Sequence, residues 1–176
     1  MDIYELNRIN FRSLLKALSY PGDEFKLWPV YDSFLLAAFA TIVSPESTYY
    51  LEDQEKTKEL AQILVNAQPV SLEKADYIFC NQFQPHLLLK AKTGTSLYPE
   101  QSATLFFCPP SDLSLPVCLK GPGILNQKHT NLPVSAEFID LFLKQNQNFP
   151  LGLDVFLITK QGTVIGLPRT IYVEVR

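Results

Sequence analysis

Histidine and cysteine are scarce in this sequence, and their scarcity excludes several kinds of site. There are two histidines, His86 and His129, and three cysteines, and none of them form a C-x-x-C pair or another zinc-ligand spacing. An odd number of cysteines without such a pair predicts no disulfide framework. The G-x-S-x-G elbow that presents a nucleophilic serine is also missing. We therefore expect no metal site and no hydrolytic triad.

Charged residues are also sparse, at 19% of the chain, and 15 basic against 18 acidic residues leave a net charge of −3. No basic run is present, so a nucleic-acid surface is not expected. The start at 1–6 lacks the features of a signal peptide. The longest apolar run, 34–43, is too short to cross a bilayer. These features predict a soluble, cytoplasmic protein that does not enter a membrane.

Aromatic residues are plentiful, with twelve Phe and eight Tyr in 176 residues. A chain so rich in aromatics and so poor in charge has either a well-filled core or a surface that is covered by a partner. Composition alone leaves both interpretations open.

Hydrophobic periodicity predicts alternating strands and helices. Strands are predicted at 24–30, 48–51, 76–80, 103–108, 115–120, 153–159 and 163–167, and helices at 11–18, 34–43, 52–67 and 135–146. The last two strands are expected to form a hairpin across 160–162. No linker divides the chain. We predict one α/β domain over 1–176, with a mixed β-sheet covered by helices on both faces.

The first predicted helix has an apolar face and a cationic stripe. Asn10 is its expected cap. Its apolar face is predicted to consist of Phe11, Leu14, Leu15 and Leu18. Cations recur every fourth residue at Arg8, Arg12 and Lys16. Such a stripe is either a solvated face or a contact for an anion or a partner.

Two loops have residues that suit a phosphate group. Gly121 and Gly123 follow a strand, but Pro122 removes a backbone donor and no helix clearly begins after them, so a tight turn explains them better. The hydroxyls at 93–95 and the carboxylate of Glu100 could hold a phosphate or a magnesium-bound water, or could serve the loop backbone.

The C-terminal hairpin delivers charged residues at strand ends. Asp154 opens one strand, and Arg169 and Thr170 follow the other. A structural salt bridge between Asp154 and Arg169 is one interpretation. The other is that Arg169 and Thr170 face a cleft and bind an anionic group. Glu174 could pair with Arg8 or Arg12.

Five segments of the chain resemble the PhnH family, a subunit family of the bacterial carbon–phosphorus lyase system. They lie at 11–22, at 93–104, at 119–124, at 148–154 and at 167–174. Their order and spacing fit nearly the whole chain. Ile171 stands where the family pattern usually repeats threonine, which weakens a role for paired hydroxyls in ligand binding.

The resemblance implies a non-catalytic or co-catalytic subunit. The PhnH family is similar to the large domain of pyridoxal-phosphate-dependent transferases, as a diverged relative. PhnH proteins do not bind pyridoxal phosphate, so no cofactor is expected. It implies a homodimer that joins PhnG, PhnI and PhnJ. With PhnG, PhnI and PhnL, such a subunit supports displacement of adenine from ATP by an alkylphosphonate, which yields a ribose 1-phosphonate 5-triphosphate.

No catalytic residue is predicted. The candidate ligand-binding residues are Arg12, Gly121, Gly123, Asp154, Arg169, Thr170 and Glu174. The alternative function is a stand-alone module that binds a nucleotide or a phosphonate, with Arg169, Thr170 and the 121–123 turn lining its pocket.

Overall fold

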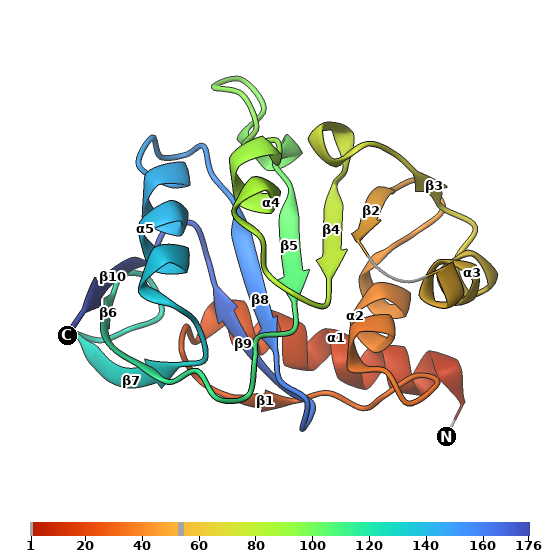
Figure 1. Ribbon diagram of the computed structural model, residues 1–176, viewed down its shortest axis with the longest axis horizontal. Helices are drawn as coiled ribbons and strands as arrows, with labels where there is room; N and C mark the ends of the chain where they lie inside the picture. The colour runs from red at the N-terminus through yellow and green to blue at the C-terminus, as the bar shows by residue number, and fades with distance from the viewer. Residues whose placement is uncertain (1, 53–54) are drawn as a thin grey trace.

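A seven-stranded mixed sheet forms the centre of the molecule (Figure 1). The computed structural model describes residues 2–52 and 55–176. The strand order is β1-β9-β8-β5-β4-β2-β3. The strands are β1 Phe25–Lys26, β2 Thr48–Glu52, β3 Gln68–Pro69, β4 Tyr77–Cys80, β5 Thr104–Phe107, β8 Asp154–Ile158 and β9 Thr163–Leu167. Strands from most of the chain thus join in one sheet, as the one-domain prediction requires.

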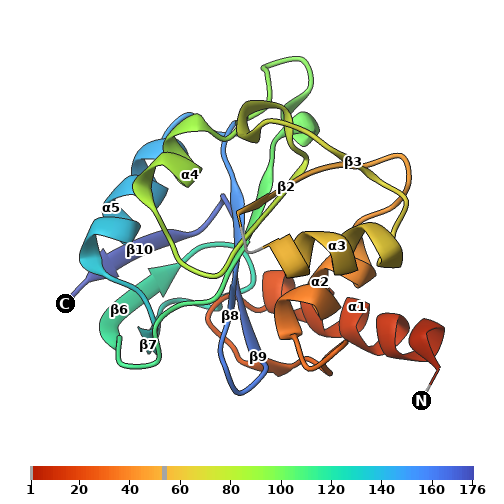
Figure 2. The ribbon, with the colours of Figure 1, turned by 45° about the vertical axis from the view of Figure 1, so that its right-hand side comes forward.

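Helices cover both faces of this sheet, which confirms the predicted layering. Figure 2 shows α1, α2 and α3 on one side of β8 and β9, and α4 and α5 on the other. The bounds are α1 Ile3–Ser19, α2 Phe34–Ile42, α3 Glu55–Leu64, α4 Pro85–Lys90 and α5 Ala136–Gln145, with short 3-10 turns at Leu72–Lys74 and Pro99–Gln101. Within the described residues, none of these helices has the length and apolar character needed to span a bilayer.

The register of the sheet brings three strand ends to one edge. β2, β4, β5 and β8 run parallel, and β9 returns antiparallel to β8. Thr104 of β5 pairs with Asp154, and Val155 pairs with Leu167. The amino ends of β5 and β8 therefore meet the carboxyl end of β9. The predicted hairpin is confirmed, since Thr159 donates its N–H to Thr163 at 2.8 Å.

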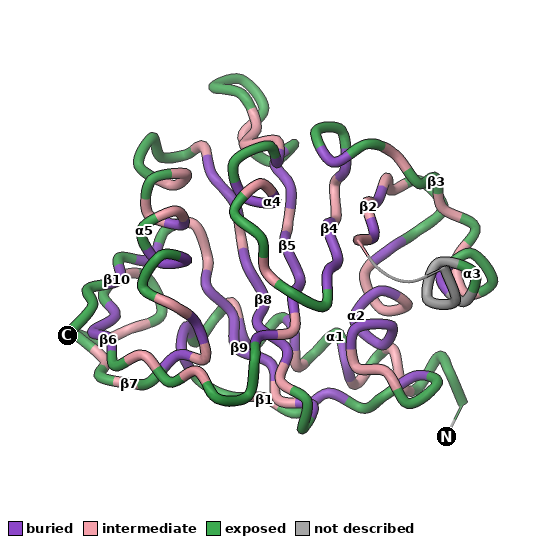
Figure 3. Tube along the Cα trace, in the orientation of Figure 1, coloured by how far each residue is buried: buried purple, intermediate pink, exposed green. Residues whose placement is uncertain are grey.

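The central strands are largely buried (Figure 3), and their side chains form one hydrophobic cluster on each face of the sheet. On the side of α1 and α2, the rings of Phe79, Phe106 and Phe156 form a column across three adjacent strands. Phe106 stacks on Phe79 with centroids 4.8 Å apart and on Phe156 at 4.7 Å. Many of the aromatic residues are thus explained by the core.

A second, three-stranded antiparallel sheet was not predicted as a separate sheet. Its order is β10-β6-β7, with β6 Leu115–Lys120, β7 Lys128–Leu132 and β10 Tyr172–Val175. Only β6 was predicted, and its bounds are confirmed. β7 has the sequence Lys-His-Thr-Asn-Leu and exposes alternate residues, so it lacks an apolar run. Its pairing with β6, rather than its composition, makes it a strand.

Several predicted boundaries are wrong in extent. The strand predicted at 24–30 is reduced to Phe25–Lys26, and the helix predicted at 52–67 is described as Glu55–Leu64, while Glu52 ends β2. Residues 53–54 lie outside the described residues. The short helix α4 was missed because six residues are too few to show a helical period.

Asn10 is not a cap, because α1 begins seven residues earlier. Its side chain is fully buried and pairs with the backbone of one residue. Asn10 Nδ2 donates to the Trp28 carbonyl at 3.0 Å, and the Trp28 N–H donates to Asn10 Oδ1 at 2.8 Å. The buried amide therefore fixes the chain after β1 against α1.

We expect Asn10→Ala to lower the free energy of unfolding by about 2 kcal/mol, because the Trp28 N–H and carbonyl lose their partners. Chemical denaturation monitored by circular dichroism would measure this change. Asn131→Ala, at an exposed position in β7, is the control. A loss below about 0.5 kcal/mol for Asn10→Ala would contradict the role of this pair.

The buried face of α1 also differs from the predicted one. Leu14 and Ala17 are buried, and Leu18 is half-buried. Phe11 and Leu15, predicted to face the core, are exposed. Because the helix turns its Asn10–Leu14–Ala17 face inward, the apolar residues on its flank remain in solvent.

Candidate functional site

Arg169 and Asp154 form an ion pair at the shared edge of β5, β8 and β9. Arg169 Nη2 lies 2.6 Å from Asp154 Oδ2, Nε lies 3.3 Å from Oδ1, and the Arg169 backbone N–H donates to Oδ1 at 2.8 Å. The two side chains are 15% and 21% exposed. The salt bridge is therefore present, as one of the two sequence interpretations predicted.

The guanidinium of Arg169 also binds a loop that is distant in sequence. Arg169 Nη1 donates to the carbonyl of Pro99 at 3.0 Å. The Gly152 N–H donates to the carbonyl of Thr93 at 3.0 Å. Each of the three guanidinium nitrogens thus donates to a protein oxygen, so a ligand anion would compete with Asp154 and Pro99 for the same donors.

Gly152 allows the chain just before β8 to pack closely against Asn146 at the end of α5. Its φ is +141°, and a Cβ built on it would lie 2.2 Å from Asn146 Oδ1. The same Asn146 oxygen accepts the Leu153 N–H at 2.7 Å. The peptide bond between Phe149 and Pro150 is cis. A side chain at 152 would therefore displace the end of α5 from β8.

A cleft of about 510 Å³ lies beside the ion pair. It is lined by Pro122, Leu143, Asn146, Gln147, Phe149, Arg169, Thr170, Ile171 and Tyr172. Thr170 is exposed, and Phe149 and Tyr172 are large exposed rings. The cleft offers a mainly apolar wall with amide and hydroxyl groups.

The 121–123 segment is a tight turn that joins β6 to β7. The Ile124 N–H donates to the Gly121 carbonyl at 3.1 Å. A Cβ on Gly121 would lie 3.0 Å from the Thr170 carbonyl, and one on Gly123 would lie 2.3 Å from the Ser19 carbonyl. Both glycines have positive φ. Close backbone packing, against the C-terminal loop on one side and α1 on the other, explains them.

A polar cavity of about 390 Å³ lies at the amino ends of β4 and β5, beside the 93–95 loop that the sequence marked as a candidate for holding a phosphate, although Asp76 and Lys92 were not predicted to line it. It is lined by Asp76, Lys92, Gly94, Thr95 and Gln101. Asp76 accepts from Lys92 Nζ at 2.5 Å and from Thr48 Oγ1 at 2.7 Å. One weak signal for Lys92 is that it immediately precedes the Thr93-Gly94-Thr95 segment.

Partial burial acts to raise the pKa of Asp76, but the hydrogen bonds from Lys92 and Thr48 and the charge of Lys92 outweigh it, so the pKa lies below its usual value. The folded state thus binds this proton more weakly than the unfolded state. The resulting stabilisation is present above the ordinary carboxyl pKa of about 4 and is lost as pH falls through the lower folded value.

Asp76→Asn should therefore reduce stability at neutral pH by about 1 kcal/mol, since the partly exposed pair is screened by solvent. The difference from the unchanged protein should shrink below about pH 4. Urea unfolding between pH 3 and pH 7 would measure it, with Asp140→Asn at an exposed position of α5 as the control. A difference that does not depend on pH would contradict the role assigned to this carboxylate.

Arg12 and Glu174 do not belong to this cluster. Arg12 is exposed in the middle of α1, which is compatible with both a solvated face and a partner contact. Glu174 Oε2 lies 3.6 Å from Lys120 Nζ across β10 and β6, so the expected pairing of Glu174 with Arg8 or Arg12 is wrong. The structure thus brings Asp154, Arg169, Thr170 and Gly121 together and separates the other two charges from them.

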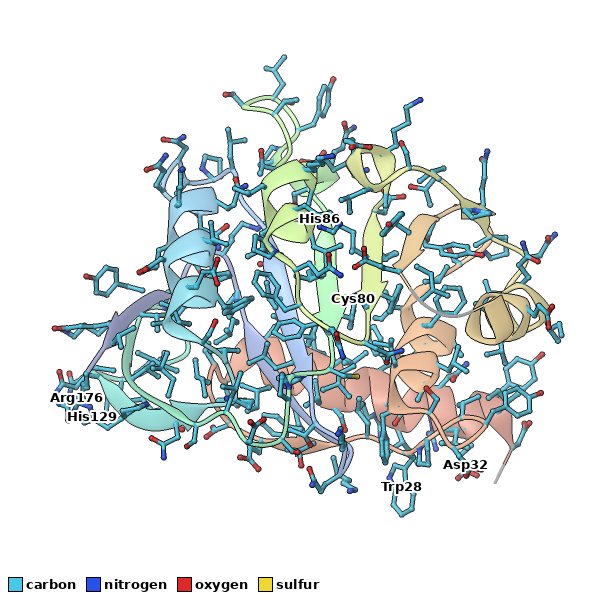
Figure 4. The ribbon with its side chains drawn as sticks, in the orientation of Figure 1. Trp28, Asp32, Cys80, His86, His129 and Arg176 are labelled. Atoms are coloured by element: carbon cyan, nitrogen blue, oxygen red, sulfur yellow. The ribbon has the colours of Figure 1, made fainter. Side chains whose placement is uncertain are left out.

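The two histidines lie apart from each other (Figure 4), and neither is among the residues that line the cleft. His86 Nε2 lies 3.2 Å from Glu52 Oε1, and His129 contacts Gln127 and Arg176 near the C-terminus. Across the described residues, no three His, Cys, Asp or Glu side chains are grouped as metal ligands.

Comparison with protein families assigns the chain. Residues 4–174 match the model of a family described as bacterial phosphonate metabolism protein (PhnH). The chain belongs to the PhnH family. A curated relative from Stutzerimonas stutzeri, named "Putative C-P lyase subunit protein HtxG", is 28% identical over 173 residues. The match covers 94% of this chain and 85% of the relative.

The segments that resemble PhnH are distant in sequence but converge in the fold. Segment 93–104 meets segments 148–154 and 167–174 through the Thr93–Gly152 and Pro99–Arg169 hydrogen bonds. Segment 119–124 packs on segment 167–174 at Gly121 and on the end of segment 11–22 at Gly123. Ile171, the departure from the PhnH pattern, is buried. In this member of the PhnH family, the five segments are therefore linked to one another by backbone and side-chain contacts. The cleft lined by Arg169 opens beside them.

Proposed function

We propose that this chain is a subunit of the carbon–phosphorus lyase core complex in phosphonate catabolism. In this role it supports transfer of an alkylphosphonate to the ribose C1 of ATP with release of adenine. The match of residues 4–174 to the PhnH family carries this proposal. The name of the relative, "Putative C-P lyase subunit protein HtxG", supports the same role.

A non-catalytic or co-catalytic role accounts for the geometry of the family segments. Arg169, the best candidate for anion binding, donates to Asp154 and Pro99. The two glycines of the 121–123 turn serve backbone packing. Because these groups hold the fold together, we infer that the subunit contributes surface and positioning to the complex rather than the reacting group.

The partners that we propose are a second copy of the chain and the PhnG, PhnI, PhnJ and PhnL subunits, in the cytoplasm. We also propose that the domain is a diverged relative of the large domain of pyridoxal-phosphate-dependent transferases, without that cofactor. A seven-stranded, largely parallel sheet with β9 antiparallel is compatible with this origin.

Reconstitution tests the proposed function. Purified chain is mixed with its PhnG, PhnI, PhnJ and PhnL partners, ATP and methylphosphonate, and adenine release is measured by chromatography. We expect release to fall at least tenfold when this chain is omitted. Equal release in its absence would exclude the proposed role.

A stand-alone binding module is the second candidate, since the cleft of about 510 Å³ exposes Thr170 beside Arg169. Calorimetric titration of the isolated chain with ATP and with methylphosphonate tests it. Binding that is lost in Thr170→Val, together with no effect of the chain in the reconstituted reaction, would favour this module over the subunit.

A further inference from the structure

The outer side of α1 exposes large apolar residues that the core does not use. Tyr4 is 80% exposed, Phe11 is 51% exposed and Leu15 is 56% exposed. The positions 4, 8, 11 and 15 are three or four residues apart, so their side chains lie along one face of the helix. A row of large apolar side chains along one exposed helix face is typical of a binding surface.

Cations border this apolar row. Arg8 lies within it, and Arg12 and Lys16 continue along the adjacent row. No ion pair to these three side chains occurs among residues 2–52 and 55–176 as described. Glu5 is the one acidic residue inside the helix. The outer side of α1 is therefore positive, although the whole chain has a net charge of −3.

α1 is held so that this side cannot turn inward. On the inward side of the helix, Asn10 is bonded to the Trp28 backbone, and Ser13 Oγ donates to the Lys26 carbonyl at 2.7 Å. The helix backbone also lies directly on β9, since a Cβ built on Gly166 would be 2.5 Å from the Ala17 carbonyl. Such a rigid surface loses little conformational entropy when it binds.

A second copy of the chain is a poor occupant of this surface. A two-fold dimer places the same patch on both sides of the interface, so the cations of one helix would face those of the other. Like charges in an interface disfavour association. A different polypeptide with carboxylates around an apolar groove matches both the charge and the apolar row.

We propose that the outer face of α1, defined by Tyr4, Arg8, Phe11, Arg12 and Leu15, is the docking surface for a different, acidic protein subunit. The apolar side chains would fill a groove on that subunit, and the arginines would pair with carboxylates at its rim. Tyrosine and arginine are frequent among the residues that dominate binding energy. This inference rests on the proposed function, because it names the surface that meets another subunit of the complex.

Variants of the apolar row provide the first test. Phe11→Glu and Leu15→Glu change exposed residues, so the fold should be retained. Each variant is purified alone, the PhnG, PhnI and PhnJ partners are co-produced without it, and its affinity for that partner assembly is measured by surface plasmon resonance. We expect at least a 30-fold loss of affinity, which is typical of a central interface residue. Leu89→Glu, on α4 at the opposite face of the sheet and 49% exposed, is the matched control and should bind normally.

Charge reversal provides the second test. Arg8→Glu with Arg12→Glu should weaken binding and should remove most of its dependence on salt between 0.1 and 0.5 M, because ionic strength screens an ion-pair interface. Lys90→Glu on α4 reverses one positive charge elsewhere and should leave both the affinity and the salt dependence unchanged; it is compared with Arg8→Glu alone, which makes the same change of charge on α1.

The outcomes separate this inference from the proposed function. If the unchanged chain binds the partner subunits and the α1 variants bind equally well, the docking surface is wrong and the proposed function stands. If the unchanged chain binds none of those subunits, the proposed function fails and the inference fails with it. Loss of a homodimer in Phe11→Glu would assign the surface to a second copy and overturn the proposal. Binding of the unchanged chain to anionic phosphatidylserine vesicles that is lost in Phe11→Glu would assign it to a membrane and overturn it equally.

Discussion

Replacement of Phe106 by alanine is expected to lower the free energy of unfolding by about 4 kcal/mol. Phe106 is fully buried between the rings of Phe79 and Phe156, at centroid distances of 4.8 and 4.7 Å. Removing the ring loses both its transfer free energy and its contacts, and it leaves a cavity in the middle of the sheet. For a chain of this length, the melting temperature should fall by about 8–16 °C. Calorimetry and urea titration would measure both quantities.

Phe11→Ala is the matched control for this experiment, because it removes the same ring from an exposed position on α1. Its effect on stability should stay within about 0.5 kcal/mol. Equal losses for the two variants would contradict the central place of the Phe79–Phe106–Phe156 column in the core.

Arg169→Ala is expected to lower the free energy of unfolding by about 3 kcal/mol. The variant leaves the partly buried Asp154 carboxylate and the Pro99 carbonyl without the guanidinium donors that serve them now. Loss of one partner of a buried ion pair costs about 3–5 kcal/mol, and the remaining exposure of this pair places the effect near the lower end. Denaturant titration would measure the loss.

A double-mutant cycle separates the ion pair from the other contacts of Arg169. In a background of Asp154→Ala, the additional effect of Arg169→Ala should be at least about 1 kcal/mol smaller than in the unchanged chain. Arg169→Lys should recover only part of the stability, because lysine cannot make the two-pronged contact. Full stability in Arg169→Ala, with loss of reconstituted activity alone, would instead assign Arg169 to ligand binding.

The sequence predicted helices and strands well wherever a single apolar run forms the element. The run at 34–43 became α2, with Ser33 Oγ accepting the Leu36 N–H as its cap. The last hairpin and β6 also formed where alternation and turn residues placed them. β7 and β10 were missed because both belong to the small sheet, where pairing with β6 compensates for weak local patterns.

The candidate site was predicted in part. The Asp154–Arg169 pair was one of the two interpretations of the sequence, because Asp154 begins one strand of the hairpin and Arg169 follows the other, which is a local relation. The contacts of Arg169 with Pro99 and of Gly152 with Thr93 were not expected, since they join segments that are about 60–70 residues apart in sequence. The Asp76–Lys92 pair was missed for a similar reason, since no local pattern relates a residue before β4 to one after α4.

By itself, the sequence determined the family, the scarcity of metal ligands and nucleophiles, and most of the helices and strands. These properties depend on residue identity and on local periodicity, and both are present in the chain before it folds. The tertiary structure alone decided that the segments 93–104, 148–154 and 167–174 meet at the amino ends of β5 and β8 and that Phe11 and Leu15 remain in solvent. The sheet order and the packing of α1 on β9 decide these features, because they minimise the free energy of all the elements together rather than that of any one segment.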